Sequence, residues 1–102
     1  MNVVAIVGSA ARSRRTRRAV EAAVAGVLAA QPTTHFEIVD LSELRISMAD
    51  GRPADASSDD TARVVSATLR AEAVILATPI YRGSYTGALK NLLDQLPLEA
   101  LE

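Results

Sequence analysis

Two unbroken apolar runs constrain the fold of this chain more than any other feature. The first spans Val3–Val7 and ends at a glycine, and the second spans Ala73–Ala77 and leads into Thr78. Strands covered on both faces of a sheet are continuously apolar, whereas strands with one exposed face alternate between apolar and polar residues. The first run therefore predicts a central, parallel β-strand and the second run a further parallel strand, in a protein that packs helices on both faces of its sheet.

The segment Thr34–Asp40 predicts a third strand of more polar character. His35 and Glu37 interrupt it, so that Phe36 and Ile38 alternate with polar neighbours. This pattern is typical of a strand at a sheet edge. Because right-handed crossovers leave few arrangements, we expect the parallel strand order 2-1-3, as at the start of a flavodoxin-like sheet.

Apolar residues at helical spacing predict three helices that connect and follow these strands. The inner residues expected in the first helix are Val20, Ala23, Val24, Val27 and Leu28. Those expected in the second are Ala62, Val65 and Leu69, and those in the third are Leu89, Leu92, Leu93 and Leu96. Gln31-Pro32 should end the first helix, and Ser58, Asp59 or Asp60 is a candidate cap for the second. The order β-α-β-α-β-α predicts an α/β, three-layer, doubly wound domain over residues 1–102.

The strand predicted over Ala73–Ala77, which is the third in chain order, lies at an open edge although it is apolar throughout. Proteins usually protect such an edge with charge, proline or a bulge, and Ala73–Ala77 contains neither a charge nor a proline. We expect one of two explanations. Either the chain is the N-terminal portion of a longer domain, truncated before its last two strands, or a partner subunit covers the edge in a homo-oligomer.

Composition and charge argue against several classes of protein. The chain has no cysteine, which excludes a disulfide scaffold, a thiolate zinc site and a cysteine nucleophile. Its formal net charge of -1 argues against a general nucleic-acid binder. No apolar run approaches the roughly 20 residues that span a bilayer, and no signal peptide is recognisable. We therefore expect a cytoplasmic protein with no nucleic-acid or membrane partner, and the acidic residues show no spacing typical of a metal site.

Two loops that follow the apolar strands are predicted to form one site. Ligands of open parallel sheets bind beyond the carboxyl ends of strands where the strand order reverses, here between strands one and three. The loops Gly8–Thr16 and Thr78–Thr86 emerge at those two ends. Hydroxyls, arginines and a helix start make the first loop suitable for a terminal phosphate. It has neither a Walker pattern nor a G-x-G-x-x-G fingerprint.

Simpler interpretations stay open for the individual residues of these loops. Any one serine or threonine of the first loop is also explained as a helix cap, and most of the arginines as a solvated helix surface. Tyr81 and Tyr85 either pack internally or contact a planar ligand. His35 is interpreted as an ordinary surface residue.

The segment Ala77–Asp94 closely resembles the corresponding segment of the NAD(P)H-dependent FMN reductases, in particular those of the alkanesulfonate-utilisation type. It carries the pattern T-P-x-Y-x-x-S-Y-x-G-x-L-K. Gly8-Ser9, with Thr16 farther on, resembles the phosphate loop of the family. Two family positions in that loop hold Ala11 and Arg14 here, whereas Arg12 and Ser13 offer the usual residue types with a one-residue shift.

The resemblance implies an enzyme that holds FMN with its phosphate in the first loop and its ring against the second. NADPH or NADH would stack on the flavin and pass hydride to it, and the reduced flavin would leave for a partner monooxygenase. No catalytic side chain is implied, because the chemistry belongs to the cofactor. The cofactor-binding residues implied are Ser9, Arg12, Ser13, Arg14, Thr16, Thr78, Pro79, Ile80, Tyr81 and Ser84. The alternatives are a quinone or azo-compound reductase that uses the same site, and a truncated, non-catalytic flavodoxin-like module.

Overall fold

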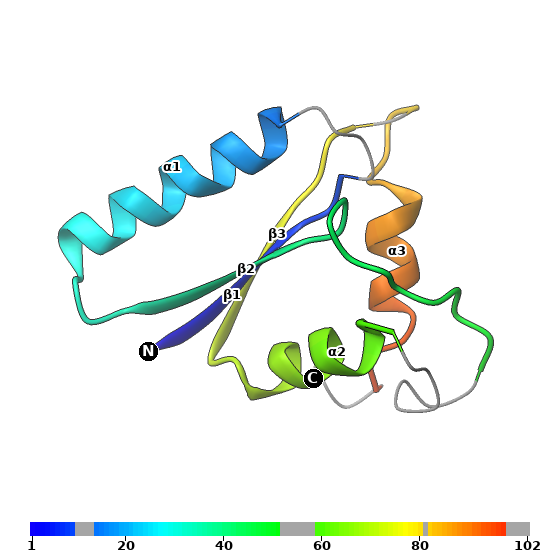
Figure 1. Cartoon of the computed structure of the whole chain (residues 1–102). Coiled ribbons are helices and arrows are strands. Elements are labelled where there is room, and N and C mark those ends of the chain that lie inside the picture. Colours follow the sequence, from blue (N-terminus) through cyan, green and yellow to red (C-terminus); the bar gives the residue numbers. More distant parts are fainter. Residues whose placement is uncertain (10–13, 52–58, 81, 98–102) are drawn as a thin grey trace.

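The computed structural model describes residues 1–9, 14–51, 59–80 and 82–97. The strands are β1 (Asn2–Val7), β2 (His35–Asp40) and β3 (Ala73–Ala77), and the helices are α1 (Arg15–Ala30), α2 (Thr61–Arg70) and α3 (Gly87–Leu93). All strand pairs are parallel, and the order is β2-β1-β3. In Figure 1, α1 lies on one side of the sheet, and α2 and α3 lie on the other. The predicted α/β, flavodoxin-like arrangement is thereby confirmed.

β1 occupies the centre of the sheet because it can be buried on every side. Val3 is in register with Phe36 of β2 and with Ala73 of β3, and every residue from Val3 to Val7 is buried. By contrast, the first residues of β2 alternate between exposed and half-buried positions. The polar interruptions of β2 thus correctly predicted an edge strand.

The side chains of β1 divide the hydrophobic core into two parts, since successive residues of a strand point to opposite faces. Ala5 and Val7 pack with Val20 of α1. Val4 and Ile6 pack on the other face, with buried residues of α2 and α3. The buried residues of α3 are Leu89 and Leu92, and Leu93 and Leu96 pack partly buried against the same cluster, as their spacing predicted.

α1 begins and ends close to its predicted limits, but its apolar face is covered only in part. The helix ends at Ala30 and Gln31 is its C-terminal cap. Val20 is buried, whereas Val27 is 39% exposed, so the expectation of an inward-facing Val27 is wrong. Ala23 is exposed as well, whereas Val24 and Leu28 are half-buried. The inner face of the helix therefore follows Val20, Val24 and Leu28, which are spaced four residues apart.

The inner face of α2 differs from the sequence prediction. Leu69 is 48% exposed, and the buried residues are Thr61, Val64, Val65, Ala67 and Thr68. Threonine is tolerated inside because its hydroxyl finds a partner. The Thr61 hydroxyl donates to Asp59 (2.5 Å) and accepts from the Ser47 N–H (2.8 Å), while the Thr68 hydroxyl donates to the Val64 carbonyl (2.8 Å). None of the described helices is long and apolar enough to cross a membrane.

Candidate functional site

The two predicted loops begin at adjacent positions on the carboxyl edge of the sheet. The Gly8 N–H donates a hydrogen bond to the Ala77 carbonyl over 2.7 Å, which joins the residue after β1 to the last residue of β3. The Thr86 hydroxyl donates to the carbonyl of the same Gly8. Figure 1 shows the ends of β1 and β3 and the start of α3 at this one end of the molecule. The loop after β1 and the loop after β3 therefore start from a common point.

Gly8 allows this close approach because it has no side chain. A Cβ atom at this position would lie 3.0 Å from the Ala77 carbonyl oxygen and 3.0 Å from the Cβ of Leu89. Either contact is tighter than ordinary van der Waals packing. The glycine that ends the first apolar run is thus required by the packing between β1, β3 and α3.

Thr86 connects three elements of the site through its hydroxyl and its backbone. It is buried, and its hydroxyl accepts a hydrogen bond from the Leu89 N–H (3.1 Å), which caps the start of α3. Its own N–H donates to the Thr78 hydroxyl over 3.1 Å. This last bond closes the loop that runs from the end of β3 to the start of α3.

The tip of that loop projects outward from the sheet. Arg82 and Gly83 have consecutive positive φ angles of 52° and 78°, a conformation that glycine adopts freely and arginine rarely. Ser84 and Tyr85 are exposed, and the side chain of Ile80 is 76% exposed. The loop therefore presents an apolar side chain, a hydroxyl and a phenol to the surroundings.

The N-terminus of α1 offers backbone N–H groups at the same edge of the sheet. Arg14 is its N-terminal cap and makes no side-chain capping hydrogen bond, and the first turn contains no acidic residue. The first four N–H groups of a helix lack helical partners, and the helix dipole favours an anion there. Thr16, the second residue of the helix, is half-buried. This helix start has the donors that an anion such as a phosphate requires.

Two of the arginines at the start of α1 are held by acidic residues that follow β2. Arg17 donates to the Asp40 carboxylate over 3.1 Å, and Arg14 pairs with Glu43 at 3.3 Å. Burial raises the pKa of Asp40, but hydrogen bonds from the hydroxyl and N–H of Ser42, together with Arg17, hold that pKa below its ordinary value. The Asp40 carboxylate is therefore ionised at neutral pH, and its pair with Arg17 ties α1 to the end of β2.

The predicted site residues fall into three groups in the structure. Ser9 is buried and Thr78 and Pro79 are half-buried near the bond between Gly8 and Ala77, and Thr16 is half-buried at the start of α1. Exposed residues of the two loops are Arg14, Ile80 and Ser84. Residues that lie outside the described part of the chain are Arg12, Ser13 and Tyr81. The structure thus brings the start of the first loop and both ends of the second loop together.

Sequence reasoning missed the parts played by Thr86 and by the Arg17–Asp40 pair. A threonine followed by Gly87 and the leucine series is a recognisable N-terminal cap of a helix, so the capping role of Thr86 had a signal. No sequence signal indicated the hydrogen bond from the Thr86 hydroxyl to the Gly8 carbonyl. Arg17 is half-buried and was not distinguishable in the sequence from its solvated neighbours.

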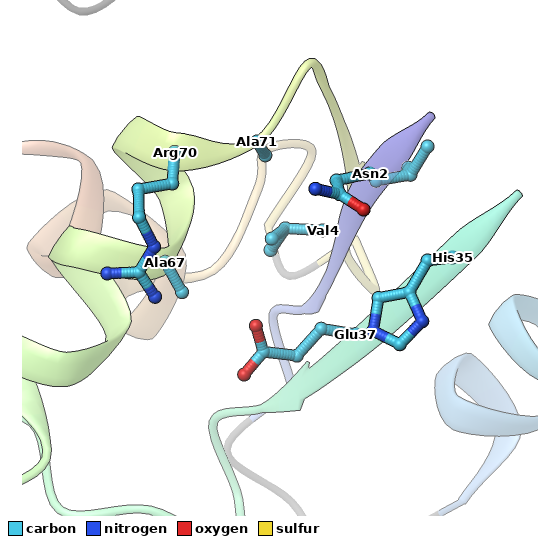
Figure 2. Close-up of a pocket in the computed structure, with 8 residues that line it drawn as sticks. Asn2, Val4, His35, Glu37, Ala67, Arg70 and Ala71 are labelled. Carbon is cyan, nitrogen blue, oxygen red and sulfur yellow. The ribbon is translucent and has the colours of Figure 1, made fainter.

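A separate cavity lies at the opposite end of the strands. Its volume is about 150 Å³, and Asn2, His35 and Arg70 are among its lining residues. Figure 2 shows Asn2 on β1, His35 and Glu37 on β2, and Arg70 on α2. Asn2 and His35 begin their strands and are paired in register. The cavity is therefore remote from the loops, and no group of acidic or histidine residues in the described ranges could hold a metal ion.

A parallel sheet of order 2-1-3 with two loops meeting beyond β1 and β3 defines a flavodoxin-like α/β protein. The family model described as NADPH-dependent FMN reductase matches residues 1–102, and the chain belongs to that family.

Individual relatives agree with this assignment. An NAD(P)H-dependent FAD/FMN reductase of Geobacillus thermodenitrificans is 36% identical over 70 residues, which cover 69% of this chain and 38% of the relative. An FMN reductase (NADPH) of Pseudomonas aeruginosa is 28% identical over 99 residues, which cover 97% of this chain and 53% of the relative. The apo crystal structure of an NADH:FMN oxidoreductase, EMOB, superposes with a TM-score of 0.81 at 36% identity, covering 98% of this chain and 52% of that one. The chain thus spans about half the length, or less, of these relatives.

Proposed function

We propose that this chain is an NAD(P)H-dependent FMN reductase whose FMN site is formed by the loops after β1 and β3. The proposal rests on two hydrogen bonds at Gly8. Its N–H donates to the Ala77 carbonyl, and its carbonyl accepts from the Thr86 hydroxyl. Family membership supplies the class of reaction. Residues 1–102 would then act as one flavin-binding domain.

The phosphate of FMN would lie at the start of α1. The backbone N–H groups there and the hydroxyls of Ser9 and Thr16 are donors of the kind that a phosphate monoester accepts. Hydrogen bonds to a charged group contribute about 1.5–3 kcal/mol each, compared with about 0.3–1 kcal/mol from the helix dipole. Arg14, which is exposed and pairs at the surface with Glu43, can exchange that weak pair for a phosphate. Arg17 is retained by Asp40 and keeps a structural role.

The ring of FMN would lie against the segment Thr78–Ile80 and Ser84. Ile80 leaves an apolar side chain largely exposed at the site, and a flat, largely apolar ring would remove it from water. The hydrogen bond between Thr86 and Thr78 fixes the two ends of this loop relative to each other before a ligand binds. Tyr81, which lies outside the described residues, retains its predicted place beside the ring.

Bound FMN would supply the redox chemistry by accepting a hydride from NADPH or NADH. The side chains of this chain then need only to bind, to orient and to exclude water. The proposed acceptor of the reduced flavin is a flavin-dependent monooxygenase, as the resemblance of the Ala77–Asp94 segment implies.

The rate of NAD(P)H oxidation by the 102-residue chain in the presence of FMN tests this proposal. Ser9→Ala combined with Thr16→Ala should lower FMN affinity by roughly a hundredfold or more, because two hydrogen bonds to a charged group are lost. Thr33→Ala is the matched control, since Thr33 is exposed in the turn between α1 and β2. FMN affinity that is equal in the double variant and the control would reject the phosphate site.

A further inference from the structure

The cavity at the amino-terminal ends of β1 and β2 is the second concave site in the described part of the chain. Its volume is about 150 Å³, and a cavity of that size holds a molecule of about six heavy atoms. It lies between the sheet and the C-terminal turn of α2 (Figure 2). None of the described residues of β3 or α3 lines it, so it is formed by β1, β2 and α2 alone.

Small side chains on α2 leave this space open. Ala67 and Ala71 line the cavity from the helix, and Val4 lines it from the sheet. Val4 and Ala67 are buried in the hydrophobic core on this face, and Ala71 packs against that core. The inner wall of the cavity is therefore apolar, and it suits a small aliphatic group.

Two opposite charges lie on the rim of the cavity without pairing with each other. Glu37 extends from β2 and Arg70 from α2, and no ion pair in the described part of the chain joins them. Glu37 lies 4.0 Å from Arg63, and Arg70 donates to the Ser66 hydroxyl over 2.5 Å. Because Glu37 and Arg70 are both exposed, each can turn from its surface contact to a ligand at little cost in free energy.

Asn2 and His35 add polar groups beside these charges. They begin β1 and β2, are paired in register and line the cavity. The backbone N–H of Asn2 donates to the Glu72 carboxylate. No described residue forms a hydrogen bond with the Asn2 side-chain amide or with the His35 ring. Both groups are therefore available to a ligand.

The two opposite charges determine which ligand charge the cavity accepts. A simple anion at Arg70 would lie close to the Glu37 carboxylate, and a simple cation at Glu37 would lie close to the guanidinium. Each arrangement brings like charges together, which disfavours binding. A molecule that carries both charges satisfies both side chains. An α-amino acid has its ammonium and carboxylate groups on neighbouring carbons, and alanine, with one further methyl group, matches the size of the cavity.

We propose that this cavity binds a small zwitterionic amino acid of the size of alanine. The Arg70 guanidinium receives the carboxylate, since its planar fork matches that group. The Glu37 carboxylate accepts hydrogen bonds from the ammonium group, and the methyl group lies against Val4 and Ala67. No residue of the two flavin loops takes part, so this inference does not rest on the proposed function.

Titration of the 102-residue chain with millimolar alanine, followed in proton–nitrogen NMR spectra, tests the proposal. We expect saturable shifts in the signals of the Asn2 side-chain amide and the Ala67 N–H, while the Thr86 N–H signal stays unchanged. Propionate lacks the ammonium group and ethylamine lacks the carboxylate. Each should bind more weakly than alanine by roughly tenfold or more, because charged hydrogen bonds are lost. An absence of saturable shifts would overturn the proposal, as would propionate or ethylamine binding as tightly as alanine.

Two charge variants test the roles of Arg70 and Glu37. Arg70→Gln should weaken alanine binding by roughly tenfold or more. Glu37→Gln should weaken alanine binding to a similar extent and strengthen propionate binding, because the repulsion between the two carboxylates is removed. Arg18→Gln is the matched control, since Arg18 is exposed on α1, on the other side of the sheet.

The R18Q chain should bind alanine as the wild type does. R70Q and E37Q chains that bind alanine as tightly as R18Q would overturn the proposal. An E37Q chain that binds propionate no better than the wild type would also contradict it.

Discussion

The hydroxyl of Thr86 donates a hydrogen bond to the backbone carbonyl of Gly8, although the two residues are 78 positions apart in the chain. This contact places the start of α3 against the end of β1. The same hydroxyl accepts from the Leu89 N–H, so its donor and acceptor functions are both used. One buried side chain thus positions the helix start and both loops of the candidate site.

Replacing Thr86 with valine should destabilise the fold while nearly preserving its volume. The change removes a helix cap, which contributes about 1 kcal/mol, and leaves a buried carbonyl without its donor, which costs about 1–3 kcal/mol. We expect a loss of about 2–4 kcal/mol in the free energy of unfolding, measured by urea denaturation. Thr86→Ser retains the hydroxyl and should lose less than half as much. Equal losses in the two variants would assign the effect to the methyl group.

Two glycine substitutions should change stability in opposite directions. Gly8→Ala places a Cβ within 3.0 Å of the Ala77 oxygen and of the Leu89 Cβ, and such overpacking costs about 1–3 kcal/mol. Gly26 lies inside α1, and a Cβ added there would meet no atom of another element within 4 Å. Gly26→Ala should therefore stabilise the helix by about 0.5–1 kcal/mol. Thermal unfolding of both variants tests these two predictions. A G8A variant as stable as the wild type would show that β1, β3 and α3 can move apart at little cost in free energy.

The Arg17–Asp40 pair should make part of the stability depend on pH. The folded-state pKa of Asp40 lies below the ordinary value of 3.8, so its contribution is complete above about pH 5. That contribution is lost as the pH falls below 3.8 and through the lowered pKa. Asp40→Asn should lose about 1.5–3 kcal/mol at pH 7 and show a shallower decline in acid. Urea unfolding at a series of pH values measures both effects.

Glu43→Gln is the control for the charge at Asp40. Glu43 pairs with Arg14 at 3.3 Å and lies 3.8 Å from Arg17, but its own side chain is more than half exposed. Exposed pairs contribute about 0–1 kcal/mol, so E43Q should follow the pH dependence of the wild type. A decline in acid as steep in D40N as in the wild type would place the responsible titration at another carboxylate.

The sheet was predictable from the sequence because its strands differ in the burial that they require. Val3–Val7 is apolar enough to be covered on all sides, and it lies between the other two strands. The polar residues His35 and Glu37 placed β2 at an edge, where the structure has it. Ala73–Ala77 had the pattern of a buried strand, yet it lies on an open edge.

The residues of α2 that face the core, and the hydrogen bonds that join the elements of the site, were harder to predict from the sequence. Apolar spacing assigned Leu69 to the inner face, whereas the buried Thr61 and Thr68 take inner positions with their hydroxyls satisfied. In a pattern of apolar spacing these threonines count as polar, because the pattern does not show which groups will form hydrogen bonds with their hydroxyls. The meeting of the two loops was predictable from topology alone, but the bond from Thr86 to Gly8 depends on packing at the level of single atoms.

The central claim is that the loops at Gly8 and Thr78 form one FMN site, and the fluorescence of FMN titrated with the 102-residue chain tests it most directly. Binding should quench the fluorescence with saturation at micromolar protein, and Gly8→Ala should weaken the binding while Gly26→Ala leaves it unchanged. Fluorescence that stays constant throughout the titration with the folded wild-type chain would contradict the claim.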